Sequence, residues 1–210
     1  MNRIVLLGPP GSGKGTQAEY LAAALKIPAI STGEIFRREM KQNTPLGQEI
    51  SADMKAGRLV SDDIVDKVVK ERLSQPDIKD GFVLDGYPRT LHQAVYLDEI
   101  NTVDYAVNIQ VRDTVVMDRI KSRRHCAVCG ANFNLLTKPP RQIDKCDSCG
   151  GRLEVRADSQ PAVIAERLAT YHFNNDPILN YYQQHNKLIE IDGEPDIDQV
   201  WQAVRNRLQV

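Results

Sequence analysis

The stretch Gly8-Pro9-Pro10-Gly11-Ser12-Gly13-Lys14-Gly15-Thr16 decides the fold of this chain, because it lies between an apolar run and a helical pattern. Its glycines let successive backbone N–H groups turn inward, Lys14 adds a mobile positive charge, and a helix N-terminus lies behind, so the stretch suits phosphate. In the common phosphate-binding loop a Ser or Thr follows the lysine and holds Mg²⁺. Here Gly15 takes that place and Thr16 comes one residue late. The alternative, a Gly/Pro-rich turn without a ligand, is less favoured between a strand and a helix.

Apolar runs and helical patterns alternate along the rest of the chain. The apolar runs are residues 4–7, 28–31, 82–84, 105–111 and 188–191, and the helical patterns are residues 16–25, 90–100, 114–124 and 197–208, with a further helix from Gly33. This alternation is typical of an α/β fold. We therefore predict a parallel five-stranded sheet with helices on both faces.

Two stretches interrupt this alternation. Residues 31–60 indicate short helices broken at Thr44-Pro45 and at Gly57, where turn-forming residues interrupt the pattern. Residues 122–159 contain all four cysteines and indicate a small lobe of their own. We expect a core of residues 1–30, 61–121 and 160–210, a helical insert of residues 31–60 and a cysteine lobe of residues 122–159.

The amino-acid composition and the charge balance limit the classes of function that this chain can have. The 210 residues are 41% apolar, which is enough for one well-buried core,. The 27 basic and 28 acidic residues nearly balance, so bulk charge argues against coating nucleic acid or an anionic membrane. The N-terminal apolar run is too short for a secretory signal, and no run reaches membrane-spanning length. We expect a cytoplasmic protein with no nucleic-acid or membrane partner.

The four cysteines form two Cys-x-x-Cys pairs, with sixteen residues between the pairs. This spacing is typical of a site in which two turns direct four thiolates at one tetrahedral Zn²⁺. Free thiols and disulfides are the alternatives, but disulfides are rare in the cytosol. Because four thiolates leave no open position for water, the predicted metal is structural. The predicted ligands are Cys126, Cys129, Cys146 and Cys149.

Asp85 follows the apolar run of residues 82–84. Ligands of open α/β sheets bind at the carboxyl ends of the strands, so Asp85 is a candidate to orient Mg²⁺ directly or through its water molecules. The alternative is a turn cap after a strand, an interpretation that the phosphate loop makes less favoured.

Several motifs, taken in order, resemble adenylate kinases of the long-lid bacterial kind. The motifs are the loop of residues 8–16, Ile30-Ser31-Thr32-Gly33-Glu34 with Arg37, Gly57-Arg58-Leu59-Val60, Asp85-Gly86-Tyr87-Pro88-Arg89 with Gln93, residues 118–124, and Arg156 with Arg167. The match runs from residue 4 to about residue 193. The family characteristically has Gly-Lys-Gly-Thr in its loop, and Mg²⁺ is held there mainly by nucleotide phosphates and water. The resemblance implies a P-loop nucleotide kinase core, an AMP-binding insert and a zinc-binding lid formed by the cysteine lobe.

The implied reaction is reversible transfer of the γ-phosphoryl group from ATP to AMP, giving two ADP, by a monomeric enzyme. Such a transfer spreads charge over the equatorial oxygens, so the protein chiefly positions and stabilises charge. Arginine suits this task because its planar fork binds two phosphate oxygens and keeps its charge. The resemblance assigns catalytic roles to Lys14, Asp85, Arg89, Arg123, Arg156 and Arg167.

The resemblance also divides the binding residues between the two nucleotides. Arg119 is expected to stack on the ATP adenine, and its spacing from Arg123 would place both on one helix face. Gln93 and the backbone of residues 58–60 are expected to face the AMP base. The ATP group is Gly11, Ser12, Gly13, Lys14, Gly15, Thr16, Arg119, Arg123, Asn132, Phe133 and Pro195. The AMP group is Thr32, Arg37, Arg58, Leu59, Val60, Gly86, Tyr87, Pro88, Arg89, Gln93, Arg156 and Arg167.

Some of these residues have simpler interpretations, and two positions depart from the family pattern. Singly, Arg119 or Arg123 is an ordinary solvated surface residue, and Thr32 is a helix cap. The family usually has two acids after the lid arginine, but Ser159 replaces the second one here, so we expect an altered rate rather than lost activity. Arg58 stands where lysine is commoner.

Two rival functions stay open at this point. A kinase for UMP, CMP or GMP would use the same core, since base choice rests on few contacts. A nucleotide-switched protein whose zinc ribbon contacts nucleic acid belongs to another class. The cysteine lobe argues against the second rival, because acids offset its basic residues and Phe133 is its only aromatic residue,.

Overall fold

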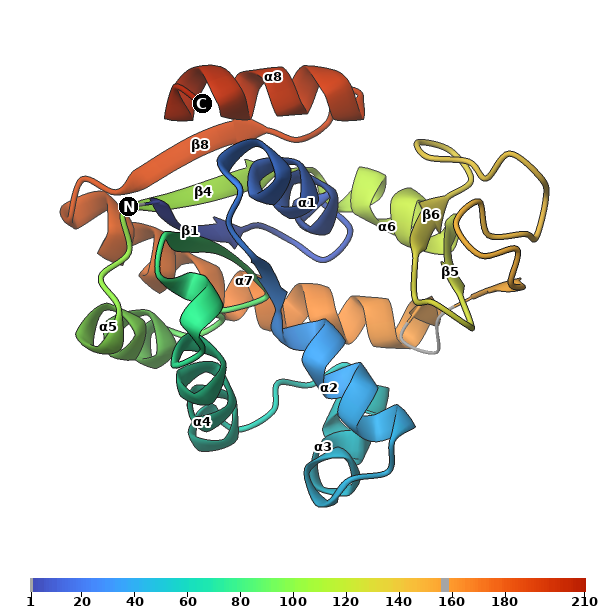
Figure 1. Ribbon diagram of the computed structural model, residues 1–210, viewed down its shortest axis with the longest axis horizontal. Helices are drawn as coiled ribbons and strands as arrows, with labels where there is room; N and C mark the ends of the chain where they lie inside the picture. The colour runs from blue at the N-terminus through green and yellow to red at the C-terminus, as the bar shows by residue number, and fades with distance from the viewer. Residues whose placement is uncertain (1, 156–158) are drawn as a thin grey trace.

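A computed structural model describes residues 2–155 and 159–210, with a parallel five-stranded sheet at its centre (Figure 1). The strand order is β2-β3-β1-β4-β8, so β1 pairs with β3 on one side and with β4 on the other. The α/β prediction is therefore confirmed. The strands are β1 (Asn2–Leu7), β2 (Ala29–Ser31), β3 (Gly81–Asp85), β4 (Tyr105–Gln110) and β8 (Leu188–Asp192).

Helices cover both faces of this sheet (Figure 1). The alternating side chains of β1 show why: Ile4 and Leu6 pack on one face, and Val5 and Leu7 pack on the other, since successive side chains of a strand point in opposite directions. The first face is covered by α1 (Lys14–Leu25) and α8 (Ile197–Leu208). The second is covered by α4 (Asp62–Leu73), α5 (Leu91–Ile100) and α7 (Pro161–Gln184), with the short 3₁₀ turn η1 (Pro76–Ile78) before β3.

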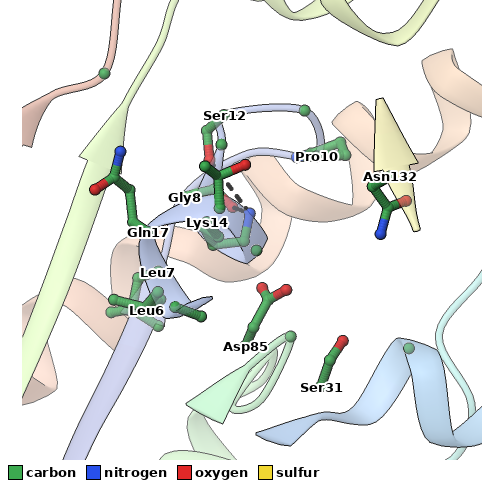
Figure 2. Close-up of a pocket in the computed structure, with 18 of the residues that line it drawn as sticks. Leu6, Leu7, Gly8, Pro10, Ser12, Lys14, Gln17, Ser31, Asp85 and Asn132 are labelled. Carbon is green, nitrogen blue, oxygen red and sulfur yellow. Dashed lines mark hydrogen bonds between the residues drawn. The ribbon is translucent and has the colours of Figure 1, made fainter. Parts of the chain in front are cut away.

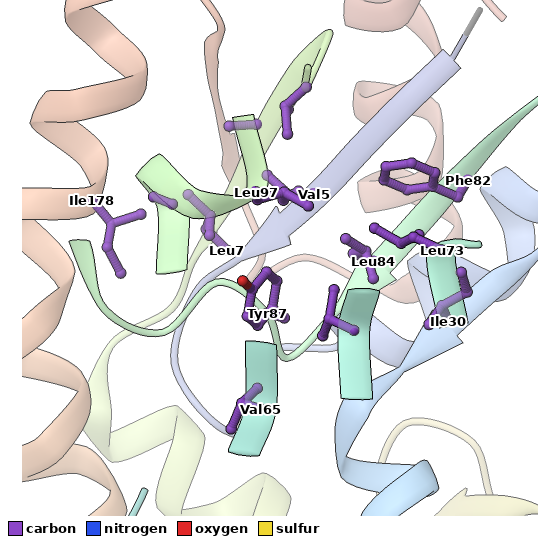
Figure 3. Packing of buried hydrophobic residues seen from close by; sticks show 14 of the residues in the cluster. Val5, Leu7, Ile30, Val65, Leu73, Phe82, Leu84, Tyr87, Leu97 and Ile178 are labelled. Atoms are coloured by element: carbon purple, nitrogen blue, oxygen red, sulfur yellow. The ribbon is translucent and has the colours of Figure 1, made fainter. Parts of the chain in front are cut away.

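The second face holds the larger core cluster (Figure 3). Phe82 and Leu84 of β3 are fully buried there, beside Tyr87 from the loop that follows the strand. Continuous burial on both faces explains the near-continuous apolar runs of the strands. The loop after β3 is thus anchored on the hydrophobic core.

Two helices, α2 (Thr32–Lys41) and α3 (Pro45–Ala56), extend away from the sheet (Figure 1). The Thr44 side chain caps α3 by accepting a hydrogen bond from the Gly47 N–H at 3.1 Å, and Pro45 occupies the first turn, where its missing N–H costs nothing. Both helices lie within residues 31–60, the segment expected to form the helical insert.

A separate antiparallel sheet, with strands in the order β6-β5-β7, lies within residues 122–159. Its strands are β5 (Arg123–Cys126), β6 (Asn132–Asn134) and β7 (Leu153–Glu154). It is joined to the core by α6 (Asp113–Lys121) on one side and precedes α7 on the other. We call this lobe the lid.

The helix expected over residues 114–124 ends early. α6 stops at Lys121, with Ser122 as its cap, and Arg123 pairs with Asn134 in the lid sheet. The expectation that Arg119 and Arg123 share one helix face is therefore wrong, because strand pairing takes the backbone of Arg123 out of the helix. Among the described residues, none of the helices is long and apolar enough to cross a membrane.

Candidate active site

A cleft of about 300 Å³ opens at the carboxyl ends of the central strands. Leu7, Ser31 and Asp85, the last residues of β1, β2 and β3, all contribute to its lining. Strand order reverses beside β1, and such switch points are where open α/β sheets bind ligands. The glycine-rich loop and the first turn of α1 form one side of this cleft (Figure 2).

The loop is shaped to leave N–H groups available at the start of α1. Gly13 caps the helix with φ of 99°, in the left-handed region that favours glycine. Among the described residues, no side chain caps this end of the helix, so its first N–H groups are open to an anion. All eleven residues of the predicted ATP group line the cleft.

Lys14 lies in this cleft with its ammonium group close to the loop (Figure 2). The ammonium donates to the carbonyl oxygens of Gly8 and Pro9, each at 2.7 Å. Burial lowers the pKa of Lys14 to about 8, Asp85 opposes this effect, and three nearby arginines reinforce it. The lysine is therefore mainly protonated at neutral pH, the form that binds a phosphate.

Asp85 faces the loop from the end of β3 (Figure 2). A Cβ atom placed on Gly15 would lie 3.5 Å from Asp85 Oδ2, so the carboxylate stands beside the position that usually carries the Mg²⁺-binding hydroxyl. The site thus offers a carboxylate where the common loop offers a hydroxyl.

The turn that follows β8 forms another part of the cleft lining. Arg119 donates from Nη1 to the Gly193 carbonyl at 2.8 Å and from Nη2 to the Glu194 carbonyl at 3.0 Å. The Arg112 guanidinium holds the Glu194 carboxylate at 2.6 Å and keeps its pKa at about 2. Arg119 therefore links α6 to this turn, and Arg119, Gly193 and Pro195 all line the cleft.

The lid contacts the helical insert through two hydrogen bonds to α2. Lys41 of α2 donates to the Ala127 carbonyl at 3.2 Å, and Asn132 of β6 donates to Glu34 of α2 at 3.5 Å. Asn132, Phe133 and Arg123 line the cleft from the lid side. Sequence reasoning identified these lid residues but missed Glu34 as the partner of Asn132.

A second, smaller cleft of about 50 Å³ lies beneath the helical insert. Its lining includes nine of the twelve residues in the predicted AMP group: Thr32, Arg37, Arg58, Leu59, Val60, Gly86, Arg89, Gln93 and Arg167. Pro88 lines the larger cleft instead. The two clefts share Arg37, Arg89 and Arg167, so these arginines stand where the clefts meet.

Gly86 shapes the wall of the smaller cleft. Thr32 Oγ1 and Arg89 Nε donate to its carbonyl oxygen at 2.9 and 2.8 Å. Gly86 has φ of 84°, and an added Cβ would lie 2.9 Å from Arg89 Nη2, so only glycine fits without displacing the arginine. The Thr32 hydroxyl thus supports the loop that carries Arg89.

Tyr87 and Arg156 differ from the other predicted residues. The Tyr87 side chain is fully buried and donates to Asp66 Oδ1 at 2.6 Å, and burial raises its pKa. Its side chain therefore supports the loop from the core and does not line either cleft. Arg156 lies outside the described residues.

The four cysteines meet in the lid, as their spacing predicted. Their Sγ atoms all lie within 4.8 Å of one another, with Cys126 and Cys149 3.5 Å apart and Cys129 and Cys146 3.6 Å apart. These separations are far too long for disulfides. The backbone N–H of Cys129 lowers the pKa of Cys126 to about 6, which favours the thiolate form of this one cysteine. The group fits one tetrahedral metal ion.

Comparisons with known proteins agree with this geometry. The family model described as "Adenylate kinase" matches residues 6–187. The chain belongs to the adenylate kinase family. It is 47% identical to an adenylate kinase of Thermosipho melanesiensis, with 97% of each chain covered, and 45% identical to one of Methanocella arvoryzae, with 97% of this chain and 96% of that protein covered. An adenylate kinase of Symbiobacterium thermophilum is 44% identical, with 98% of each chain covered. As a member of this family, the protein is a phosphotransferase.

Proposed function

We propose that this adenylate kinase transfers the γ-phosphoryl group of ATP to AMP reversibly, forming two ADP, and that the two clefts hold the two nucleotides. The observation that carries this proposal is that the clefts share Arg37, Arg89 and Arg167. A donor phosphate in the loop and an acceptor phosphate in the smaller cleft would meet at these cations. Direct transfer needs reacting oxygens held in line and charge neutralised around them.

On the ATP side, the residues of the glycine-rich loop and Lys14 bind the phosphates. The N–H groups at the start of α1 receive the phosphate oxygens, and Lys14 moves from the Gly8 and Pro9 carbonyls to the β and γ oxygens. Arg119 and the turn near Pro195 hold the adenine, supported by the hydrogen bonds that fix Arg119 to that turn. Asn132 and Phe133 contact the ATP ribose and base from the lid.

On the AMP side, Arg37 and Arg89 hold the α-phosphate as bidentate partners. Gln93 and the backbone of residues 58–60 face the base, and Arg58 makes its contact through the backbone because its side chain is paired with Asp53 at 2.8 Å. Arg123 and Arg167 surround the transferring group, and the family resemblance assigns a role there to Arg156 as well. Their charges stabilise the equatorial oxygens where charge develops.

The cofactor with ATP is Mg²⁺, which neutralises phosphate charge and orients the γ-phosphoryl group. Asp85 is the residue that would orient it, through water molecules, from the end of β3. Gly15 leaves that space free of a side chain, which accounts for the unusual Gly-Lys-Gly-Thr sequence.

The metal of the lid is Zn²⁺ in a structural role. Sulfurs placed about 2.3 Å from one tetrahedral Zn²⁺ lie about 3.8 Å apart, close to the 3.5 and 3.6 Å of the two nearest pairs. Four thiolates leave no site for water or substrate. The ion fixes the shape of the lid, and closure of the lid excludes water from the phosphoryl group. By the family resemblance, the enzyme acts as a cytoplasmic monomer.

The test is ADP formation from Mg·ATP with AMP, UMP, CMP and GMP offered separately. We expect turnover with AMP, and a loss of about 100-fold or more in the Arg89→Ala variant because an arginine at the transferring group is removed. Arg38→Ala is the matched control, since Arg38 is an exposed cation on α2. Preference for another monophosphate would change the acceptor, and no transfer to any acceptor would overturn the proposal.

A further inference from the structure

Gln93 is a buried amide whose two ends are both bonded to the protein. It is 2% exposed and lines the smaller cleft. Its Oε1 accepts a hydrogen bond from the Arg89 backbone N–H at 2.7 Å, and its Nε2 donates to Asp62 Oδ1 at 2.7 Å. Two short bonds to a buried amide fix the position of the group, and their chemistry fixes its orientation.

The orientation follows from what each partner can do. The Arg89 backbone N–H only donates, and an ionised carboxylate only accepts. Turning the Gln93 amide over would place its NH₂ group against the N–H of Arg89 and its oxygen against the oxygen of Asp62. Both hydrogen bonds would be lost in a buried place, so the amide is held one way round.

Asp62 is itself held in place from both carboxylate oxygens. While Oδ1 receives the Gln93 amide, Oδ2 receives the Thr90 hydroxyl at 3.0 Å. The Thr90 oxygen also accepts from the Gln93 backbone N–H at 3.2 Å and caps α5. Asp62 lies in the first turn of α4, where the helix dipole favours a negative charge. The carboxylate is therefore a fixed acceptor beside Gln93.

A primary amide has two N–H hydrogens and two oxygen lone pairs. Asp62 uses one hydrogen and Arg89 uses one lone pair, so one donor and one acceptor remain for a ligand in the cleft. Adenine offers an amino donor next to a ring-nitrogen acceptor, whereas guanine offers an oxygen acceptor next to a ring N–H donor. An amide held one way round can satisfy only one of these two orders when the base enters in a fixed direction.

We infer that Asp62 is a positioning residue that sets base specificity, because it locks the Gln93 amide in the orientation that accepts adenine and rejects guanine. This inference rests on the proposed function, in which the smaller cleft holds AMP. The phosphate arginines fix the direction from which the base enters, so guanine cannot gain the same contacts by turning over. Asp62 touches no substrate and acts through Gln93.

The test compares AMP and GMP as acceptors in Asp62→Asn and Asp62→Ala variants. Alanine removes the acceptor altogether. Asparagine keeps the shape of the side chain if alanine impairs folding, but its amide can turn either an oxygen or an NH₂ group toward Gln93, so it no longer forces one orientation. We expect the ratio of kcat/KM for AMP over GMP to fall roughly 5- to 100-fold, the range over which a bidentate contact discriminates between bases. The change should appear in KM for the monophosphate, with KM for ATP unchanged.

Two further variants separate specificity from general support. Asp63→Asn removes the neighbouring charge from the same helix turn, where the Asp63 side chain is exposed, and should leave the ratio unchanged. In a Gln93→Leu background we expect the ratio to be low already, and adding Asp62→Asn should lower it no further, since the two residues act as one unit.

The outcomes are distinguishable. Equal losses with AMP and GMP in the Asp62 variants, or a further fall in the Gln93→Leu background, would overturn the inference and leave the proposed function intact. A wild-type enzyme that prefers another acceptor to AMP would instead overturn the proposed function.

Discussion

The central sheet and the lid differ in how many apolar side chains they bury. Strands of the sheet are covered by helices on both faces, and two large clusters of buried residues lie between them. The described part of the lid buries one small cluster, Cys126, Phe133, Cys146 and Leu153, and two of these four residues are cysteines. Several large apolar side chains of the lid are exposed, including Ile143 at 86% and Val128 at 67%.

The difference shows what each part needs in order to fold. Burial of apolar surface is the main favourable contribution to folding, and the sheet has enough of it. A lobe of about 40 residues rarely supplies enough and usually needs a metal or disulfides. The four thiols of the lid lie within 4.8 Å of one another and could bind such a metal. The core should therefore be stable without metal, whereas the lid should depend on it.

The largest expected effect comes from removing a metal ligand. Cys146→Ser should abolish stable metal binding and unfold the lid, since structural Zn²⁺ supplies roughly 10–16 kcal/mol of apparent binding energy in zinc-finger peptides. Amide hydrogen exchange should show lid amides losing protection while the amides of β1 and β3 keep theirs. Metal content, measured by atomic absorption, should fall from one ion per chain to none.

Ser148→Ala is the control for this variant, because Ser148 is exposed and lies between Cys146 and Cys149. It should keep both the metal and the lid protection. Persistent protection of the lid amides in metal-free Cys146→Ser would remove the contrast between the two regions.

A smaller effect is expected from deleting apolar side chains in each region. Leu84→Ala in the fully buried centre of the sheet should lower the free energy of unfolding by about 2–5 kcal/mol. Phe133→Ala should change the free energy of global unfolding by less than about 1 kcal/mol with metal bound, if the proposed metal rather than the Phe133 contact holds the lid together. Urea unfolding monitored by circular dichroism measures both values. Equal losses would mean that the lid and the core unfold as one unit.

Much of the sheet and the cleft could be predicted because their signals are local. The glycine-rich loop, the apolar runs and the cysteine spacing each carry their own geometry within a few residues. The end of α6 could not be predicted, since Arg123 leaves the helix to pair with Asn134, eleven residues later in the chain. Long-range pairing of this kind leaves no mark in a helical pattern.

The 24-residue helix α7 was missed for another reason. Pro177 lies inside it, and an internal proline normally ends a helix. Its buried residues pack in two different places: Ile164 and Leu168 lie against α6, and Ile178 and Tyr182 lie in the larger core cluster. Tertiary packing therefore maintains a helix that its own sequence does not favour.

Asp62 was missed because its role depends on a neighbour 31 positions away, Gln93. Adjacent acids before a helical segment are usually explained by the helix dipole alone. Sequence reasoning could place Gln93 at the AMP base only through the family resemblance, and nothing in the sequence around residue 62 pointed to an amide partner.

The smallest expected effect links the lid to the core through Lys14. Arg123, the first residue of the lid sheet, is one of the charges that lower the pKa of Lys14 toward about 8, after burial itself and together with Arg89 and Arg167. Below that pH the ammonium is protonated and ready for phosphate; as the pH rises through about 8 the free enzyme loses this charge, so ATP affinity should fall. Arg123→Gln removes one neighbouring positive charge and should move the midpoint of Lys14 titration to higher pH, by less than one unit because burial remains the main cause.

The measurement is the ¹³Cε shift of Lys14 against pH in lysine-labelled protein, with the signal assigned by its loss in Lys14→Arg. Arg124→Gln is the control, since Arg124 lies next in the strand and its guanidinium donates to the carbonyl oxygens of Lys121 and Arg123; it should leave the midpoint in place. Metal-free Cys146→Ser should shift the midpoint in the same direction as Arg123→Gln, because an unfolded lid no longer holds Arg123 over the loop. The midpoint could instead move in Arg123→Gln but not in the metal-free enzyme. Arg123 would then affect the pKa of Lys14 even when the lid is unfolded. The core site would depend on the lid only for the exclusion of water.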